Sequence, residues 1–327
     1  MKKNIAIIMG GYSSEYKISL LSGNVVYDFL DKDKFNVYRI HIFREKWVYV
    51  DENQEEHPIN RHDFSITLNA GTVNFHCVFN AIHGSPGEDG LMQAYFQVIG
   101  LPQTSCDYYQ AALTFNKRDL LSVLKPFGIK SATSFYLNRG DHVEADDIIN
   151  KVGLPCFVKA NRAGSSFGIT KVYHKEELAA AMETAYLEDD EILIESFLDG
   201  TEVSVGVIKY QGKTKVLPIT EIVPENDFFD YAAKYEGQSQ EITPARINKT
   251  QEKNVIQVAT QIYDTLKMRG YTRSEFIFIG DDPYLLEVNT TPGLTTRSIL
   301  PQQAEIAGIS LPQLFESSIW EALGENK

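Results

Sequence analysis

The sequence is short of cysteine and has no long hydrophobic run, and each shortage excludes a class of protein. Its only cysteines are Cys77, Cys106 and Cys156. They form no Cys-x-x-Cys pair, and two lie in apolar, strand-like runs, which is typical of buried, reduced thiols and predicts a cytosolic protein. The apolar run "IAIIM" near the start is too short for a signal-peptide core, and no segment approaches the ~18 residues of a membrane span.

Positive charge is also in deficit, with 31 lysines and arginines against 44 acidic residues and a net charge of -13. This balance argues against a nucleic-acid partner, although an acidic protein can bind nucleotides where cations or metal ions are concentrated locally. The composition is otherwise that of a globular protein, with 43% hydrophobic and 23% charged residues. A chain of 327 residues predicts two or three domains.

The first hundred residues contain two strand-turn-helix patterns. "NIAIIMGG" predicts a buried strand that ends in a glycine turn, and "ISLLSGNVVYDFL" has apolar residues at helical spacing. "FHCVFNAIHGSPGEDGLMQAYFQVIG" repeats the order: a strand, a glycine-rich loop and a short helix. Strands that alternate with helices predict a largely parallel sheet, with ligands at the carboxyl ends of its strands.

The pattern changes after about Leu101. A helix in "FNKRDLLSVLKPFG", short strands and a helix in "KEELAAAMETAYL" predict a middle domain. Beyond Asp199-Gly200, the runs "EVSVGVIKY" and "KVLPITEIV" joined by "QGKT" predict a hairpin, followed by the helix "TQEKNVIQVATQIYDTLKMRG" and a second hairpin, "EFIFIGDDPYLLEVN". These elements predict a third, antiparallel domain.

The loop "KANRAGSSFG", residues 159–168, has the composition of a phosphate-binding loop. Its glycines let backbone amides approach an anion, Ser165 and its neighbour offer hydroxyls, and Lys159 can reach the same anion from the preceding strand. The loop lies between two strands, so it fits neither the Walker A form nor the Rossmann fingerprint. A flexible hairpin is the alternative interpretation.

The second hairpin carries the most specific acidic pattern. A turn with an odd number of residues at 280–282 would place Glu275 opposite Glu287, with Asn289 on the same face. Two facing carboxylates with an amide oxygen are ligands that suit Mg²⁺ on nucleotide phosphates. The alternative is a solvated acidic face in a different register.

Four further segments are polar, and each is ambiguous when taken alone. "TTPGLTTRS" could hold a carboxylate or an oxyanion through main-chain amides and Arg297, or could be a plain connection. His83 could bind a ligand or cap a turn, and Glu15 could be a ligand or a partner of a helix dipole. "AAKYEGQSQEITPA" has no apolar period, yet carries Lys234 and Tyr235 at its head.

Six motifs in this order closely resemble the D-alanine:D-alanine ligases of the ATP-grasp superfamily. They are "GGYSSEYKISLLSG", "HGSPGEDG", "KANRAGSSFGITKV", "ILIESFLDGTEVSV", "DYAAKYEG" and "LLEVNTTPGLTTRSILPQ". The resemblance extends over essentially the whole chain. It implies an α/β (α+β) protein of three domains: a Rossmann-like domain at 1–103, a central ATP-grasp subdomain at 104–195 and a carboxyl-terminal subdomain at 196–327. A mobile lid would lie at 227–243.

The resemblance also implies the reaction. The γ-phosphate of ATP would pass to the carboxylate of one D-alanine, and the amine of a second D-alanine would then attack the acyl phosphate and release phosphate. The product would supply peptidoglycan precursor synthesis in the cytoplasm, and the enzyme would be a homodimer without membrane or nucleic-acid partners. A polar lid would close over the site and exclude water, to which an acyl phosphate is sensitive.

The same resemblance assigns site residues. Glu15 would hold the ammonium of the first D-alanine, with His83 nearby, and Ser165 and Tyr235 would close the site. Arg273 and Gly293 would stabilise the oxyanion. Ser298 and Ile299 would bind the carboxylate of the second D-alanine. The ATP set consists of Lys117, Lys159, Lys234, Glu195, Phe197, Leu198 and Glu202. Two Mg²⁺ ions, or Mn²⁺, would be held by Glu275, Glu287 and Asn289.

Several positions depart from the family pattern. Glu275 stands where aspartate is usual, Ser274 replaces an aliphatic residue, Ala163 replaces glutamate in the phosphate loop, and Arg297 replaces histidine. Arg297 would add positive charge beside the second carboxylate. The stretch from about residue 46 to 74 is longer than in compact relatives.

Three alternative functions remain open. The second substrate could be D-lactate or D-serine, although Tyr235 in the lid argues against D-lactate. Another carboxylate could be the substrate of a more distant ATP-grasp ligase. A regulatory nucleotide-binding protein without catalysis is the third alternative, against which the retained Arg273 counts, because a mere binder has no need of an oxyanion arginine.

Overall fold

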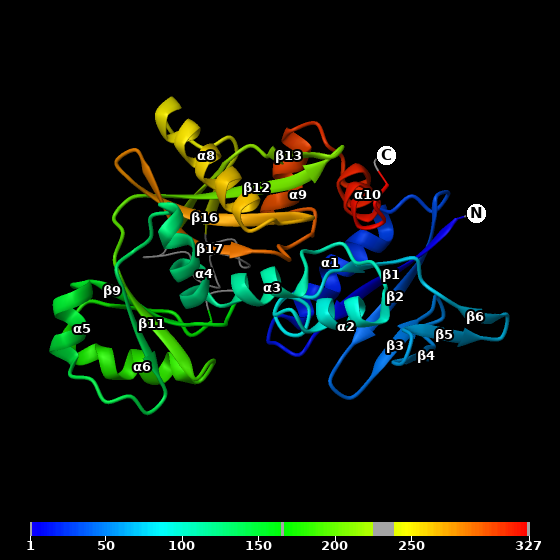
Figure 1. Cartoon of the computed structure of the whole chain (residues 1–327), viewed down its shortest axis with the longest axis horizontal. Helices are drawn as coiled ribbons and strands as arrows, with labels where there is room; N and C mark the ends of the chain where they lie inside the picture. The colour runs from blue at the N-terminus through cyan, green and yellow to red at the C-terminus, as the bar shows by residue number, and fades with distance from the viewer. Residues whose placement is uncertain (1, 165–166, 225–238, 326–327) are drawn as a thin grey trace.

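The computed structural model describes residues 2–164, 167–224 and 239–325. Its strands form three sheets of seven, four and six strands, which follow one another along the chain. Figure 1 shows the first sheet at one end of the molecule, the third in the middle and the second at the other end.

The first sheet is parallel only at its core. Its strands are β1 (Lys3–Gly10), β2 (Phe35–Ile42), β3 (Trp47–Val50), β4 (Glu56–Asn60), β5 (Ser65–Leu68), β6 (Gly71–Val73) and β7 (Cys77–Asn80). The order is β6-β5-β4-β3-β2-β1-β7, with β1 parallel to β2 and β7 and the other pairs antiparallel. The prediction of a largely parallel sheet is therefore right only for the β2-β1-β7 core. The long stretch at 46–74 forms the antiparallel strands, because its turns are too short for crossover helices.

The helices α1 (Tyr16–Phe29) and α2 (Leu91–Ile99) follow β1 and β7. Helix α1 packs closely on β1, since a Cβ atom at Gly23 would lie 2.7 Å from Cβ of Met9. The carboxyl ends of β1 and β7 both lead into glycine-containing loops, at 10–11 and 83–90. These loops therefore meet at one edge of the sheet, as the sequence predicts.

The second sheet is antiparallel, in the order β10-β9-β11-β8. Its strands are β8 (Ser134–Asn138), β9 (Cys156–Ala160), β10 (Thr170–Val172) and β11 (Glu191–Ser196). The helices of this part are α3 (Tyr108–Phe115), α4 (Lys117–Leu124), η1 (Lys125–Phe127), α5 (Ala145–Val152), η2 (Lys175–Glu177) and α6 (Leu178–Tyr186). Helices α5 and α6 pack on the sheet around the buried residues Val158, Ile192 and Ile194.

The third sheet has the order β15-β14-β12-β16-β17, with β13 paired to β12. Its strands are β12 (Thr201–Tyr210), β13 (Lys213–Val216), β14 (Thr220–Pro224), β15 (Ser239–Ile242), β16 (Tyr271–Ile279) and β17 (Asp282–Asn289). The predicted hairpin turn is present, and Gln211 (φ 50°) and Gly212 (φ 74°) adopt the positive φ angles that a two-residue turn needs. The run "KVLPITEIV" forms two strands rather than one, separated at residues 217–219.

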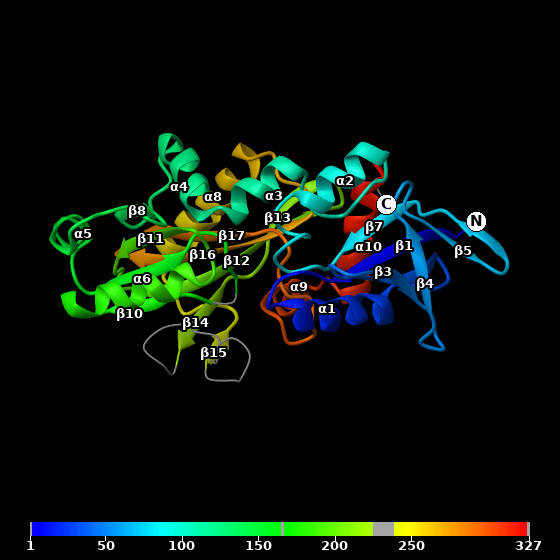
Figure 2. The same cartoon turned by 90° about the horizontal axis from the view of Figure 1, so that it is seen from below.

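The last three helices are α8 (Lys249–Thr265), α9 (Ile299–Ile306) and α10 (Leu311–Ala322). Helix α8 packs on the third sheet. Helix α10 packs between the third sheet and the first, where the rings of Phe79 and Phe315 are 5.7 Å apart. Lys3 and Glu325 form an ion pair of 2.8 Å, and the two ends of the chain lie close together in Figures 1 and 2. None of the described helices is long and apolar enough to cross a membrane.

Between β16 and β17, a β-bulge sets the register. Ile279 pairs with Asp282, so the turn has two residues, and Phe276 pairs with Leu285. The register then shifts by one residue, and Glu275 pairs with Glu287 and Arg273 with Asn289. The predicted pairing of the two glutamates is therefore confirmed, but the odd-numbered turn is not. The extra residue, Leu286, lies within β17, where a bulge bends the strand and re-aims its side chains.

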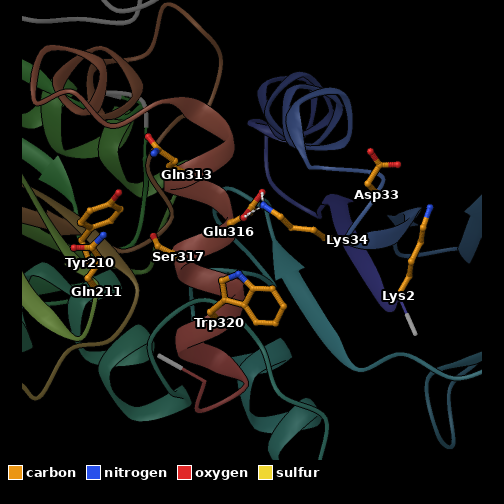
Figure 3. A pocket seen from close by; sticks show the side chains of 9 residues that line it. All are labelled: Lys2, Asp33, Lys34, Tyr210, Gln211, Gln313, Glu316, Ser317 and Trp320. Carbon is orange, nitrogen blue, oxygen red and sulfur yellow. Dashed lines mark hydrogen bonds and ion pairs between the residues drawn. The ribbon is translucent and has the colours of Figure 1, made fainter. Parts of the chain in front are cut away.

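A hollow of about 830 Å³ lies between the amino-terminal region and α10 (Figure 3). Its lining includes Lys34, Tyr210, Glu316 and Trp320, and the Lys34 ammonium lies 2.9 Å from the Glu316 carboxylate. The sequence predicts no site residue among those that line it. The predicted site residues lie around a different cavity.

Candidate active site

A smaller cavity of about 340 Å³ brings together residues from all three parts of the chain. Nine of its lining residues are predicted site residues: Glu15, His83, Lys117, Arg273, Glu287, Asn289, Gly293, Ser298 and Ile299. These residues lie in the loops after β1 and β7, at the start of α4, in the hairpin β16–β17, in the loop before α9 and at the start of that helix. Residues as distant in sequence as Glu15 and Ile299 therefore face one space.

Glu15 lies directly before α1 and is partly buried. Its side chain makes no capping hydrogen bond to that helix. A Cβ atom at Gly164 would lie 2.5 Å from Oε2 of Glu15, and one at Gly84 would lie 3.2 Å from the same oxygen. Glycines in two other loops thus leave room for this carboxylate, which faces the cavity rather than the end of its helix.

His83 is buried and hydrogen-bonded at both ring nitrogens. Its Nδ1 lies 2.6 Å from the carbonyl oxygen of Thr291, and its Nε2 lies 2.9 Å from Oγ of Ser22. A carbonyl can only accept, so Nδ1 carries the proton and Nε2 accepts from the serine hydroxyl. Burial lowers the pKa of His83, although the Glu15 carboxylate opposes this shift. His83 is therefore a neutral connector between α1 and the loop that follows β17.

Glu88 is a buried acid in "HGSPGEDG" to which the sequence analysis assigns no role. Its Oε2 accepts a hydrogen bond from the amide of Gly84 at 3.1 Å, and its Oε1 accepts from the amides of Thr290 and Thr291, each at 3.3 Å. Burial and the nearby Glu15 carboxylate raise its pKa to about 7. One carboxyl group thus joins the loop after β7 to the loop after β17. In the sequence, only its place in the segment "HGSPGEDG" indicates that Glu88 could belong to the site.

Arg273 lies on β16 and lines the cavity with little exposure to solvent. Its Nε donates to Oε1 of Glu275 at 2.7 Å, and Ser204 donates to the same oxygen at 3.2 Å. The bond from Arg273 to Glu275 orients the guanidinium, and the bond from Ser204 holds the Glu275 carboxylate in place. An arginine held in this way presents a fixed positive charge to a group in the cavity at no further cost in side-chain entropy.

The donor set of Glu275, Glu287 and Asn289 fits a hard divalent cation. Glu275 and Glu287 are directly opposed across the hairpin, and Asn289 lies two residues further along the same face. The Oε2 atom of Glu275 is buried and has no hydrogen-bond partner among the described residues. A buried carboxylate oxygen without a partner among the described residues, beside a second carboxylate and an amide oxygen, has the donor chemistry that suits Mg²⁺.

The loop after β17 ends at the amino terminus of α9. A Cβ atom at Gly293 would lie 2.7 Å from Oγ of Ser298, so this close approach requires glycine. Ser298 precedes the first turn of α9, and its hydroxyl bonds Oγ1 of Thr295 at 2.8 Å. Ile299 is buried. The first amides of a helix and a serine hydroxyl are suited to a carboxylate.

Lys117, the first residue of α4, connects the cavity to the second sheet. Its ammonium donates to the carbonyl of Ala163 at 2.8 Å and lies 3.2 Å from Oε2 of Glu287. The loop position where the family usually has glutamate thus contributes its backbone rather than a side chain. This lysine places positive charge between the acidic hairpin and the loop 159–168.

Of the remaining predicted ATP residues, those that the structure describes do not line the cavity. Lys159 on β9 and Glu195 on β11 form a buried ion pair of 2.7 Å. Burial opposes the charge on Lys159, yet the Glu195, Glu287 and Glu202 carboxylates keep its pKa above the ordinary value. The ring of Phe197 lies 4.2 Å from the Lys171 ammonium, and Leu198 follows it before β12. Ser165, Lys234 and Tyr235 lie outside the described residues.

Comparisons with known proteins agree on one family. Residues 4–106 match the family described as D-ala D-ala ligase N-terminus, and residues 123–319 match the family described as D-ala D-ala ligase C-terminus. The chain is 69% identical over 317 residues to the D-alanine–D-alanine ligase of Flavobacterium johnsoniae, covering 97% of this chain and 98% of that protein. It is 59% identical over 325 residues to the D-alanine–D-alanine ligase of Christiangramia forsetii, covering 99% and 100%.

Solved structures give the same result. The VanG D-Ala:D-Ser ligase from Enterococcus faecalis matches with a TM-score of 0.85 and 30% identity, covering 98% of this chain and 100% of that one. The D-alanine–D-alanine ligase from Bacillus anthracis complexed with ATP matches with a TM-score of 0.80 and 27% identity, covering 98% of each chain.

Proposed function

The chain belongs to the D-alanine–D-alanine ligase family, and on that basis we propose that it joins two molecules of D-alanine in an ATP-dependent reaction. The product, D-alanyl-D-alanine, serves peptidoglycan precursor synthesis. The observation that carries this proposal is the single cavity in which Glu15, Arg273 and Ser298 converge from distant parts of the chain. The fold, an α+β architecture with three sheets, agrees with this family.

The first half-reaction needs one D-alanine with its carboxylate toward the nucleotide. In our proposal, the Glu15 carboxylate binds the ammonium of this substrate, and its charge selects an amino acid over a simple acid. Support comes from its position in the cavity, where the neutral His83 offers no competing charge. Lys117, Lys159 and Lys234 bind the phosphates of ATP, and catalysis rests on positioning and charge neutralisation.

The second half-reaction produces a tetrahedral oxyanion when the amine of the second D-alanine attacks the acyl phosphate. The Arg273 guanidinium and the Gly293 amide stabilise this charge in our proposal, and both face the cavity. Ser298 and the amide of Ile299 hold the carboxylate of the second D-alanine. Ser165 and Tyr235, which lie outside the described residues, close the site over Glu15, as the family resemblance implies.

The nucleotide lies beside β9, β11 and β12 in this proposal. Glu195, Phe197 and Leu198 contact the adenine, and Glu202 binds the ribose hydroxyls. The buried pair of Lys159 and Glu195 supports this placement, because Lys159 is held next to the acidic hairpin by the charges that surround it. Between this region and the cavity lies Lys117, which contacts both the loop 159–168 and Glu287.

Glu275, Glu287 and Asn289 would hold two Mg²⁺ ions, for which Mn²⁺ can substitute. When bound, the ions neutralise charge on the phosphates of ATP. The unpartnered Oε2 of Glu275 supports the assignment despite the aspartate usual at this position. We further propose a division into domains at 1–103, 104–195 and 196–327, a homodimeric assembly and a cytoplasmic location. The lid predicted at 227–243 falls outside the described residues up to 238, and its remainder contains β15, which is paired with β14 in the third sheet.

The metal assignment is tested by Glu275→Gln. A neutral amide cannot replace a carboxylate as a Mg²⁺ ligand, so we expect the Mn²⁺ affinity of the nucleotide complex, followed by electron spin resonance, to fall about tenfold or more. The matched control is Glu252→Gln, which removes an exposed acidic charge from the first turn of α8, outside the donor set and the cavity lining. Equal Mn²⁺ binding in wild type and Glu275→Gln would contradict the assignment.

The function is tested by phosphate release from MgATP, with mass spectrometry of the products. We expect release with D-alanine, a D-alanyl-D-alanine product, and no turnover with L-alanine. D-alanine with excess D-serine or D-lactate tests the second candidate, which the likeness to a D-Ala:D-Ser ligase favours. If D-alanyl-D-serine or D-alanyl-D-lactate were the main product, the second substrate would be D-serine or D-lactate rather than D-alanine. ATP binding without turnover would favour a regulatory protein.

A further inference from the structure

Glu241 is a carboxylate in the cavity to which neither the motifs nor the proposed reaction gives a role. It lies on β15 and lines the cavity with Arg273, Arg297 and Ser298. The family resemblance places no ligand on it. Its position and surroundings indicate what it binds.

The sheet places Glu241 at the second-substrate end of the cavity. It is directly opposed to Ile222 on β14, and opposed residues in an antiparallel pair point to the same face. Ile222 packs against Ile299 in a small buried cluster. Ile299 begins the helix whose first turn would hold the carboxylate of the second amino acid. Glu241 and that carboxylate site therefore share one end of the cavity.

The contacts that Glu241 makes with the described residues are weak. Among the described residues it forms no ion pair, and its polar contact is a long one of 3.5 Å from the amide nitrogen of Gln302. The side chain is partly buried, and burial raises its pKa, while the positive charge of Arg273 acts in the opposite direction. A carboxylate that has lost part of its hydration, and whose hydrogen bond to the described residues is this long, is stabilised by an incoming cation.

The second amino acid brings such a cation. Its ammonium and carboxylate groups are attached to one carbon, so a carboxylate held at Ser298 places the ammonium only a few bond lengths away. D-lactate has an uncharged hydroxyl at that position and would leave Glu241 without a partner. Glu241 would therefore disfavour a hydroxy acid as the second substrate as well as favour an amino acid.

We propose that Glu241 binds the ammonium group of the second amino acid when this substrate enters the cavity, and thereby selects an amino acid over a hydroxy acid as the second substrate. The inference rests on the proposed ligase function and deepens it. Glu15 selects the first amino acid and Glu241 the second, so each substrate meets its own carboxylate.

The test is Glu241→Gln, which keeps the size of the side chain and removes its charge. A hydrogen bond to a charged group contributes about 1.5–3 kcal/mol, so we expect the KM for the second D-alanine to rise about tenfold to a hundredfold. The KM values for ATP and for the first D-alanine should change less than about twofold. In competition between D-alanine and D-lactate, the share of D-alanyl-D-lactate should increase, and Glu241→Asp should restore part of the amine preference.

Gln240→Ala provides the matched control, because Gln240 is the exposed neighbour on the same strand, and neighbours in a strand point to opposite faces. It should leave both KM values and the product ratio unchanged. Unchanged second-site KM and product ratio in Glu241→Gln would overturn the inference, as would a loss of ATP binding and thermal stability, which would assign Glu241 a structural role. A wild-type enzyme that forms no dipeptide would instead refute the proposed function.

Discussion

Replacement of Arg273 by alanine is expected to abolish dipeptide formation while ATP binding is nearly retained. Arg273 lies in the cavity and is oriented by its bond to Glu275, whereas the buried pair of Lys159 and Glu195 lies outside the cavity lining. Removal of one preorganised donor to an oxyanion typically lowers kcat by about 10²–10³. Steady-state phosphate release and calorimetric titration with a non-hydrolysable ATP analogue measure the two quantities separately.

The control for this variant is Arg273→Lys. Lysine keeps the positive charge but lacks the planar fork, so it should bind ATP as the wild type does and recover only part of kcat. Because Glu275 would lose its partner in Arg273→Ala, the Mn²⁺ titration described above should be repeated on that variant. A large loss of ATP affinity in Arg273→Ala, with Mn²⁺ binding unchanged, would place this arginine at the nucleotide.

Replacement of Glu88 by glutamine is expected to lower kcat about a hundredfold, because this buried residue of the cavity lining holds two loops of the site in position. Its carboxyl oxygens accept three backbone hydrogen bonds from two loops. Glutamine has one acceptor oxygen, and its amide nitrogen would face an amide donor, so one loop loses its support. A displacement of about 1 Å in the loop that carries Asn289 and Gly293 can reduce the rate by this factor.

The stability difference between the wild type and this variant should depend on pH in a defined direction. The pKa of Glu88 is raised from 4.5 to about 7, so the folded protein retains a proton that the unfolded chain releases between these values. Stability from this group is thus fully present below about pH 4.5 and is lost as pH rises to about 7, by about 3 kcal/mol. Glutamine does not titrate, so the stability difference between wild type and Glu88→Gln should narrow over this range in urea unfolding.

Asp89→Asn is the neighbouring control. Asp89 accepts one hydrogen bond from the amide of Leu91 at the start of α2, and asparagine can accept the same bond. Its kcat and its pH dependence of unfolding should match those of the wild type. If Glu88→Gln kept wild-type kcat, or showed a stability difference that did not change with pH, the positioning role of Glu88 would be wrong.

The sequence by itself determined the features of this protein that depend on short segments of the chain. The glycine turns after two apolar strands predict the edge of the first sheet, and the six collinear motifs predict the family. The turn at Gln211-Gly212 follows from the positive φ angles that two-residue hairpins require. Each of these features depends on residues that are close together in the chain, so short-range sterics and hydrophobic periodicity are sufficient to predict them.

Only the tertiary structure decided the features that depend on distant residues. Leu286 is an ordinary strand residue in the sequence, yet its bulge is what brings Glu275 opposite Glu287. Glu88 resembles any acid in a polar loop until amides 202 and 203 residues away in sequence donate to it. Glu241 acquires its setting from Ile222 across the strand pair and from α9. Burial, unpaired charge and strand register arise from how the three sheets pack, and they are therefore properties of the folded chain rather than of any short segment of it.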